Sequence, residues 1–216
     1  MSLTNEIADF EAEKKRTHDP DILDLMDATT ADLIATGIAE RAVGIGDQAP
    51  DFELPDHRGN PVALARLLET GPVILNFYRG GWCPYCNLEL RAYQRELPRI
   101  RAGGGHLLAI SPMLPDNSLS AAEKNEIDYP VLSDVGNETT GDFGLVFEVD
   151  KRIQKIYTER LGIDMVDNYG DDSFQLPLPA LYVIGKDGIV KFAYVNADYR
   201  LRADPVDVLR ALDSTG

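Results

Sequence analysis

The stretch that most constrains the fold is an apolar run followed by two closely spaced cysteines. Val73 to Tyr78 suits a buried parallel strand, and Gly80-Gly81 ends it. The tetrapeptide Cys83-Pro84-Tyr85-Cys86 then leads into a helical pattern, with Pro84 suited to the first helical position. Both sulfurs are therefore expected at a helix N-terminus, where free N–H groups and the helix dipole favour a thiolate over a thiol.

Cys83 and Cys86 are the only cysteines of the chain. A disulfide between them would close a very small loop, so a purely stabilising role is disfavoured. A structural zinc site needs about four ligands, and His18, His57 and His106 show no ligand spacing with the pair. Inert core thiols are the other alternative. A Cys-x-x-Cys beside a strand–helix unit instead predicts a redox centre, and we expect neither a metal nor another cofactor.

Length and charge limit the remaining possibilities. The 216 residues can bury one substantial core, and no linker divides them, so we expect a helical N-terminal extension (residues 1–43) and one domain (residues 44–216). A formal net charge of -15 disfavours nucleic acid and anionic membranes as partners. The sequence shows no secretion signal and no run of membrane-spanning length, so a cytoplasmic location is expected. Thiols stay reduced there unless they are cycling.

The N-terminal extension carries helical patterns but no recognisable chemistry. Leu3, Ile7 and Phe10 share one helical face, Asp19-Pro20 is typical of a helix start, and Thr30 is a candidate cap for a further helix. Apolar helical stripes usually pack on a core. We therefore expect the extension to pack on the main domain or on a second subunit of a homodimer, in preference to a catalytic role.

From Gly44 onward, the patterns predict a mixed α/β domain. A hairpin with its turn at 57–60 precedes the strand at 73–78, and the cysteine helix runs to about Arg101. A buried strand at 106–110 then implies a right-handed parallel crossover. An antiparallel hairpin over 181–195 and a helix at 205–212 complete a mixed sheet with helices on both faces.

Several segments resemble the peroxiredoxins, most closely the bacterioferritin-comigratory type. The resemblance runs from about Gly44 to Val195 and rests on these motifs: Gly46-Asp47-x-Ala49-Pro50-Asp51-Phe52-x-Leu54, Phe77-Tyr78, Ala109-Ile110-Ser111, Pro130-Val131-Leu132-Ser133-Asp134 and Phe143-Gly144-Leu145. It implies a thioredoxin fold with an N-terminal β-hairpin. It also implies thiol-dependent reduction of hydroperoxides, with electrons from a thioredoxin-like protein or glutathione.

At the site itself the resemblance divides between two families. Cys86 and Glu89 match the peroxidatic cysteine and following glutamate of peroxiredoxins, whereas Arg79 replaces their proline and Cys83 their threonine. Pro179 stands where peroxiredoxins carry an arginine.

At these positions the sequence resembles the thioredoxins and glutaredoxins, which reduce disulfides. That second resemblance implies that Trp82 shields the cysteine pair and that Tyr85 lies at the site rim. It also implies that the Leu178–Pro179 bond is cis and lies beside the pair.

Two assignments of the nucleophile stay open. Because Pro84 suits a helix that begins beside Cys83, we expect the Cys83 sulfur to face solvent and to attack large disulfides, with Cys86 available to a small peroxide. Arg79 is either a source of positive charge for the site or a solvated loop residue. Glu89 is expected to make helix-surface or local ionic contacts. A non-enzymatic redox-sensing or docking module is the alternative from another class.

Overall fold

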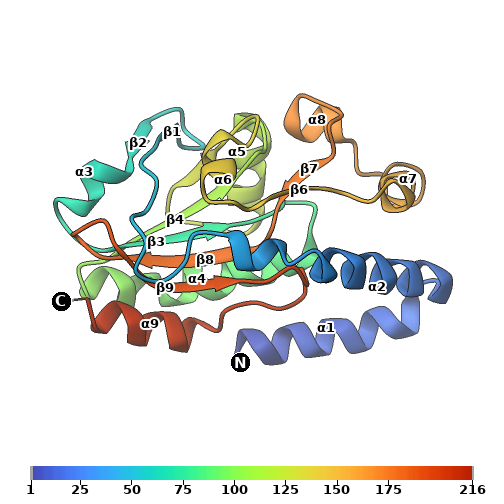
Figure 1. Cartoon of the computed structure of the whole chain (residues 1–216), viewed down its shortest axis with the longest axis horizontal. Coiled ribbons are helices and arrows are strands. Elements are labelled where there is room, and N and C mark those ends of the chain that lie inside the picture. Colours follow the sequence, from blue (N-terminus) through green and yellow to red (C-terminus); the bar gives the residue numbers. More distant parts are fainter. Residues whose placement is uncertain (1, 216) are drawn as a thin grey trace.

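The computed structural model describes residues 2–215, and a five-stranded mixed sheet lies at its centre (Figure 1). The spatial order is β5-β4-β3-β8-β9. Their bounds are Val73–Phe77 (β3), His106–Ser111 (β4), Val131–Ser133 (β5), Ala180–Ile184 (β8) and Val190–Val195 (β9). β3, β4 and β5 are parallel, while β8 runs antiparallel to both β3 and β9. The predicted mixed sheet and its C-terminal hairpin are confirmed.

Strand β3 is buried on both faces, which explains its continuous apolar sequence. Ile74 packs in a cluster with residues of α4 (Pro84–Ala102) and α9 (Pro205–Asp213), while Leu75 and Phe77 pack on the opposite face with Phe143. Helices α4 and α9 lie side by side beneath the sheet in Figure 1. β3 therefore ends in the interior of the protein, and most residues of the turn that follows it and of the first turn of α4 are buried as well.

The second face of the sheet carries short elements. β1 (Glu53–Pro55) and β2 (Pro61–Ala63) form the predicted antiparallel hairpin, and α3 (Leu64–Leu68) follows it directly. Helix α6 (Glu138–Asp142) leads into Phe143 on this face, whereas α5 (Pro115–Lys124) buries Ala121 and Ala122 in the cluster that contains α4 and α9.

One feature was not predicted, an antiparallel ribbon of β6 (Val146–Glu148) and β7 (Gln175–Pro177). The chain between its strands forms α7 (Lys151–Glu159) and α8 (Met165–Tyr169).

The N-terminal extension is helical, as predicted. It consists of α1 (Leu3–Thr17), α2 (Pro20–Ala35) and a 3₁₀ turn, η1 (Ile38–Arg41). Asp19 caps α2 by accepting a hydrogen bond from the Asp21 N–H. Thr30 does not cap a further helix: α2 continues through it, and its hydroxyl donates to the Met26 carbonyl at 2.7 Å.

Helix α1 packs on α4, and α2 packs on α7, so the extension lies against the end of the sheet where the cysteine helix begins. None of the helices between residues 2 and 215 is both long and apolar enough to cross a membrane.

Candidate active site

The two cysteines occupy the first turn of α4. Cys83 is the N-cap with extended backbone angles (φ -86°, ψ 115°), Pro84 is the first helical residue, and Cys86 is the third helical residue, in the same turn. The predicted helix start is therefore confirmed. The predicted exposure of the Cys83 sulfur is wrong, since Cys83 is 2% exposed and Cys86 is fully buried.

Cys83 is buried because other elements close over the helix start. It borders a cavity of about 110 Å³ whose walls come from the N-terminal extension, from the strand-to-helix turn and from distant segments: Phe10, Lys14, His18, Met26, Arg79, Trp82, Pro84, Tyr85, Tyr157, Leu161, Ile163 and Tyr199. Trp82 borders the same cavity as Cys83, and its shielding role stays a prediction. Tyr85 also borders this cavity, and its side chain is buried. Its hydroxyl bonds Glu11 and accepts from Lys14 at 2.8 Å.

Arg202 makes the most direct contact with a sulfur. It lies in the loop between β9 and α9, and its Nη2 donates to Cys86 Sγ at 3.4 Å. The Tyr199 carbonyl accepts from Arg202 Nε at 3.0 Å and from Nη2 at 2.9 Å, which fixes the guanidinium. Sequence reasoning missed this arginine because it follows Cys86 by 116 residues and belongs to no recognisable motif.

Glu89 is the second partner of Arg202. The two side chains form an ion pair and are only 3% and 1% exposed, so the predicted helix-surface or local contact is wrong. Burial outweighs the attraction of Arg202 and raises the pKa of Glu89 to about 7. Glu89 therefore gains or loses its negative charge near neutral pH. It does so next to Arg202, which also contacts Cys86.

The two sulfurs are driven toward opposite protonation states. Burial alone would raise the pKa of Cys86, but a hydrogen bond from Cys83 and the charges of Arg202 and Arg79 hold that pKa well below its ordinary value. Burial and the neighbouring Cys86 raise the pKa of Cys83 well above its ordinary value. The arrangement favours a Cys86 thiolate that accepts a hydrogen bond from a Cys83 thiol.

Arg79 is the second buried cation of the site. It is 3% exposed, so the alternative of a solvated loop residue is wrong. Its guanidinium hydrogen-bonds the Tyr157 hydroxyl and lies 4.9 Å from the Trp82 ring and 4.7 Å from the Tyr199 ring. Within residues 2–215 it makes no salt bridge to a carboxylate, and its Nε has no hydrogen-bond partner. Its positive charge therefore acts on the nearby cysteines.

A tyrosine from α8 locks the turn that precedes the cysteines. Tyr169 accepts a hydrogen bond from Trp82 Nε1 at 2.6 Å and donates to the Arg79 carbonyl at 2.6 Å. A Cβ at Gly80 would lie 2.6 Å from Trp82 Nε1 and 2.8 Å from the Tyr169 hydroxyl. Glycine is therefore required at position 80 for close packing. Sequence reasoning did not find Tyr169.

Pro179 does not occupy the place predicted for it. The Leu178–Pro179 bond is trans, so the cis prediction is wrong. Pro179 is buried, but it borders a different cavity from that of Cys83. The main argument for a thioredoxin-type site is thereby removed.

Together, this mixed sheet and the cysteine pair at the start of α4 define a thiol-based oxidoreductase of thioredoxin fold. The model of the AhpC/TSA family matches residues 45–193, and the chain belongs to that family. Membership assigns thiol-dependent peroxidase activity as the class of reaction.

Named relatives agree with this assignment. A Mycobacterium tuberculosis protein whose name places it among the peroxiredoxins is 32% identical over 133 residues, which cover 57% of this chain and 84% of that protein. Chloroplastic peroxiredoxin Q of Arabidopsis thaliana is 28% identical over 160 residues, with 74% of this chain and 63% of that protein covered.

Solved structures support the fold. The crystal structure of the peroxidoxin BcpB from Mycobacterium tuberculosis matches with a TM-score of 0.62 at 24% identity, covering 80% of this chain and 97% of that chain. Peroxiredoxin Q of Xanthomonas campestris matches with a TM-score of 0.58 at 19% identity, covering 80% of this chain and 97% of that chain. The predicted thioredoxin fold is confirmed.

Proposed function

We propose that the protein reduces hydroperoxides with Cys86 as the attacking thiolate and Cys83 as the resolving thiol. The observation that carries this assignment is the contact of Arg202 with the Cys86 sulfur, because nucleophilic attack requires a thiolate. Among residues 2–215, no cationic side chain hydrogen-bonds the Cys83 sulfur, and Cys83 is held as a hydrogen-bond donor to Cys86.

In the proposed reaction, the two cysteine thiols supply both electrons that reduce the peroxide. The Cys86 thiolate attacks the terminal peroxide oxygen, the O–O bond breaks, and the departing alkoxide or hydroxide takes a proton to become an alcohol or water. Cys83 then attacks the sulfenic acid on Cys86. A disulfide forms, and the second oxygen leaves as water. No second subunit is needed for resolution.

Regeneration requires two electrons from outside the chain. A dithiol of the thioredoxin type supplies them by attacking the Cys83–Cys86 disulfide, with thiol exchange through a mixed disulfide. Glutathione is the other candidate donor. A peroxide in the cavity meets Cys83 first, so the Cys83 side chain must turn aside before the peroxide reaches Cys86.

Disulfide reduction is the second candidate function. The Cys-Pro-Tyr-Cys sequence at a helix start favours it, whereas the burial of both sulfurs behind the N-terminal extension disfavours attack on a protein-sized disulfide.

Single Cys83→Ser and Cys86→Ser variants test the assignment, with a sulfenic-acid reagent to trap the oxidised cysteine. We expect hydrogen peroxide to generate a trapped sulfenic acid in Cys83→Ser, which retains Cys86. Rapid labelling of Cys86→Ser alone would reverse the roles of the two cysteines.

A coupled assay separates the two functions and the two donors. NADPH oxidation is measured with a thioredoxin system or a glutathione system, and with hydrogen peroxide, an organic hydroperoxide or a disulfide as substrate. Turnover with disulfides alone would contradict the peroxidase proposal. No turnover with any substrate would favour a redox-sensing module.

A further inference from the structure

A second cavity adjoins the one at Cys83. It has a volume of about 220 Å³ and lies beneath α2, against β6 and α7. Met26, Arg79, Tyr157 and Tyr199 border both cavities and form a wall that the two cavities share. The α2 side of this cavity lies outside the part of the chain matched by the family model, which begins at residue 45.

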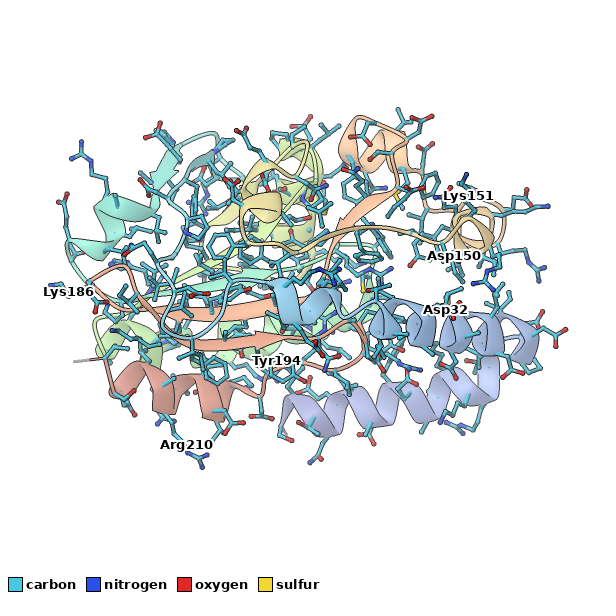
Figure 2. The ribbon with its side chains drawn as sticks, viewed as in Figure 1. Asp32, Asp150, Lys151, Lys186, Tyr194 and Arg210 are labelled. Carbon is cyan, nitrogen blue, oxygen red and sulfur yellow. The ribbon has the colours of Figure 1, made fainter. Side chains whose placement is uncertain are left out.

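Most of the surface that lines this second cavity is apolar and comes from Met26, Leu33, Phe147, Val149, Ile153, Pro179 and Ala197, together with the rings of Tyr157 and Tyr199. Three threonines in α2 or at its C-terminal end also line it, and their hydroxyls donate to carbonyls of the same helix: Thr29, Thr30 and Thr36. Arg79 is the buried cation in its wall, with a free Nε, and acidic side chains lie toward the outer edge. There Arg152 bridges Asp32 on α2 and Asp150 beside α7, at 2.9 and 2.8 Å. Figure 2 labels these two aspartates. An apolar chamber with one cationic group at its inner end suits an apolar molecule that carries a single polar group.

We infer that this second cavity binds the organic group of a hydroperoxide, so that the N-terminal extension completes the substrate site. This inference rests on the proposed peroxidase function. An apolar cavity of ~150 Å³ accommodates benzene, so this volume fits an aryl or branched alkyl group of about six to nine carbon atoms. The –OOH group then lies at the shared wall, where Arg79 donates to an oxygen and Cys83 borders the adjoining cavity. Cys86 is reached once the Cys83 side chain turns aside.

Met26 is the adaptable part of the shared wall. It is half-buried and unbranched, and its sulfur lies 3.9 Å from the Tyr199 hydroxyl. A flexible methionine side chain fits irregular apolar ligands at little cost. Of the four residues in the shared wall, Met26 is therefore the one whose side-chain movement would connect the two cavities at least cost.

Thr29→Phe tests the inference because Thr29 borders the cavity beneath α2 but not the cavity at Cys83. The added ring fills the space proposed for the organic group. The measurement is the second-order rate constant for oxidation of the reduced protein by cumene hydroperoxide and by hydrogen peroxide. We expect the ratio of the cumene to the hydrogen peroxide constant to fall about tenfold or more, since the loss of small apolar contacts in a pocket has effects of this size.

Ala28→Phe is the matched control. It introduces the same ring at the neighbouring, exposed position of α2, which borders neither cavity. The ratio should remain at the wild-type value. Thr29→Leu adds less volume, is compatible with a helix, and should lower the ratio in the same direction if Thr29→Phe does not fold.

The outcomes distinguish this inference from the proposed function. If the wild-type protein reacts with neither peroxide, the proposed function fails. If the wild-type protein reacts with both and Thr29→Phe leaves the ratio unchanged, or lowers both constants equally, the cavity is not a substrate subsite and only the inference is overturned.

Discussion

Arg202→Met removes the cation that contacts Cys86 and should raise the pKa of that thiol. At the observed 3.4 Å, two unit charges attract by about 5 kcal/mol at an effective dielectric constant of ~20 and by about 1.2 kcal/mol at ~80. These limits correspond to an increase of about one to about three and a half pKa units. Because Arg202 and Cys86 are both buried, we expect the increase in the Cys86 pKa to lie toward the upper of these two limits.

The consequence is kinetic, because the rate of peroxide reduction follows the thiolate fraction. Near neutral pH we expect the second-order rate constant with hydrogen peroxide to fall at least tenfold. The thiolate is followed by its ultraviolet absorbance during a pH titration, in a Cys83→Ser background that leaves one thiol. Arg202→Lys should recover part of the effect, since the charge is kept but the planar guanidinium is lost.

Two further variants make the result interpretable. Arg200→Met removes a nearby arginine that pairs with Asp198 and does not contact the cysteines, so the titration should be unchanged. Loss of Arg202 also leaves Glu89 buried without its partner, which typically costs about 3–5 kcal/mol of stability. Arg202→Met with Glu89→Gln avoids that cost. If the double variant titrates as Glu89→Gln does, Arg202 does not stabilise the thiolate and the reasoning is refuted.

Further predictions concern Glu89 and Tyr169. Glu89→Gln removes a negative charge beside Cys86 and should lower the pKa of that thiol further, as read by the same thiolate titration. Because the folded-state pKa of Glu89 is raised, its contribution to stability is complete below its unfolded value of 4.5 and is lost as pH rises through about 7. Urea unfolding should therefore show a smaller fall in stability over this interval in Glu89→Gln than in the wild type. Tyr169→Phe leaves the indole N–H of Trp82 without its acceptor, and we expect a loss of about 1–3 kcal/mol by urea unfolding, with Tyr194→Phe on β9 as control. Equal unfolding midpoints for these two variants would contradict the proposed role of Tyr169.

Tyr85 is the residue through which the N-terminal extension contacts the cysteine site. This residue lies between the two cysteines, and its ring packs edge-on against Phe10 of α1 with ring centroids 5.1 Å apart. Glu11 and Lys14 of the same helix hold its hydroxyl. The sequence predicted a packing role for the extension. The structure adds that its packing partner is the redox tetrapeptide itself.

Local patterns in the sequence determined the elements that carry the cysteines. The apolar run from Val73 predicted β3, because a strand buried on both faces needs apolar side chains on both. The glycines after it and Pro84 predicted the turn and the start of α4. These signals depend on neighbours along the chain, and their spacing is visible without a fold.

Only the tertiary structure decided the environment of the sulfurs. Arg202 reaches Cys86 from a polar loop, and Tyr169 reaches Trp82 from a short helix that the sequence did not predict. A lone arginine or tyrosine has no periodicity that reveals its partner. The burial of Cys83 likewise depends on α1 and α2 packing over the helix start, which the local sequence around Cys83 does not encode. The sequence thus determined where the two thiols lie on the chain, whereas long-range packing set their burial and their electrostatic surroundings.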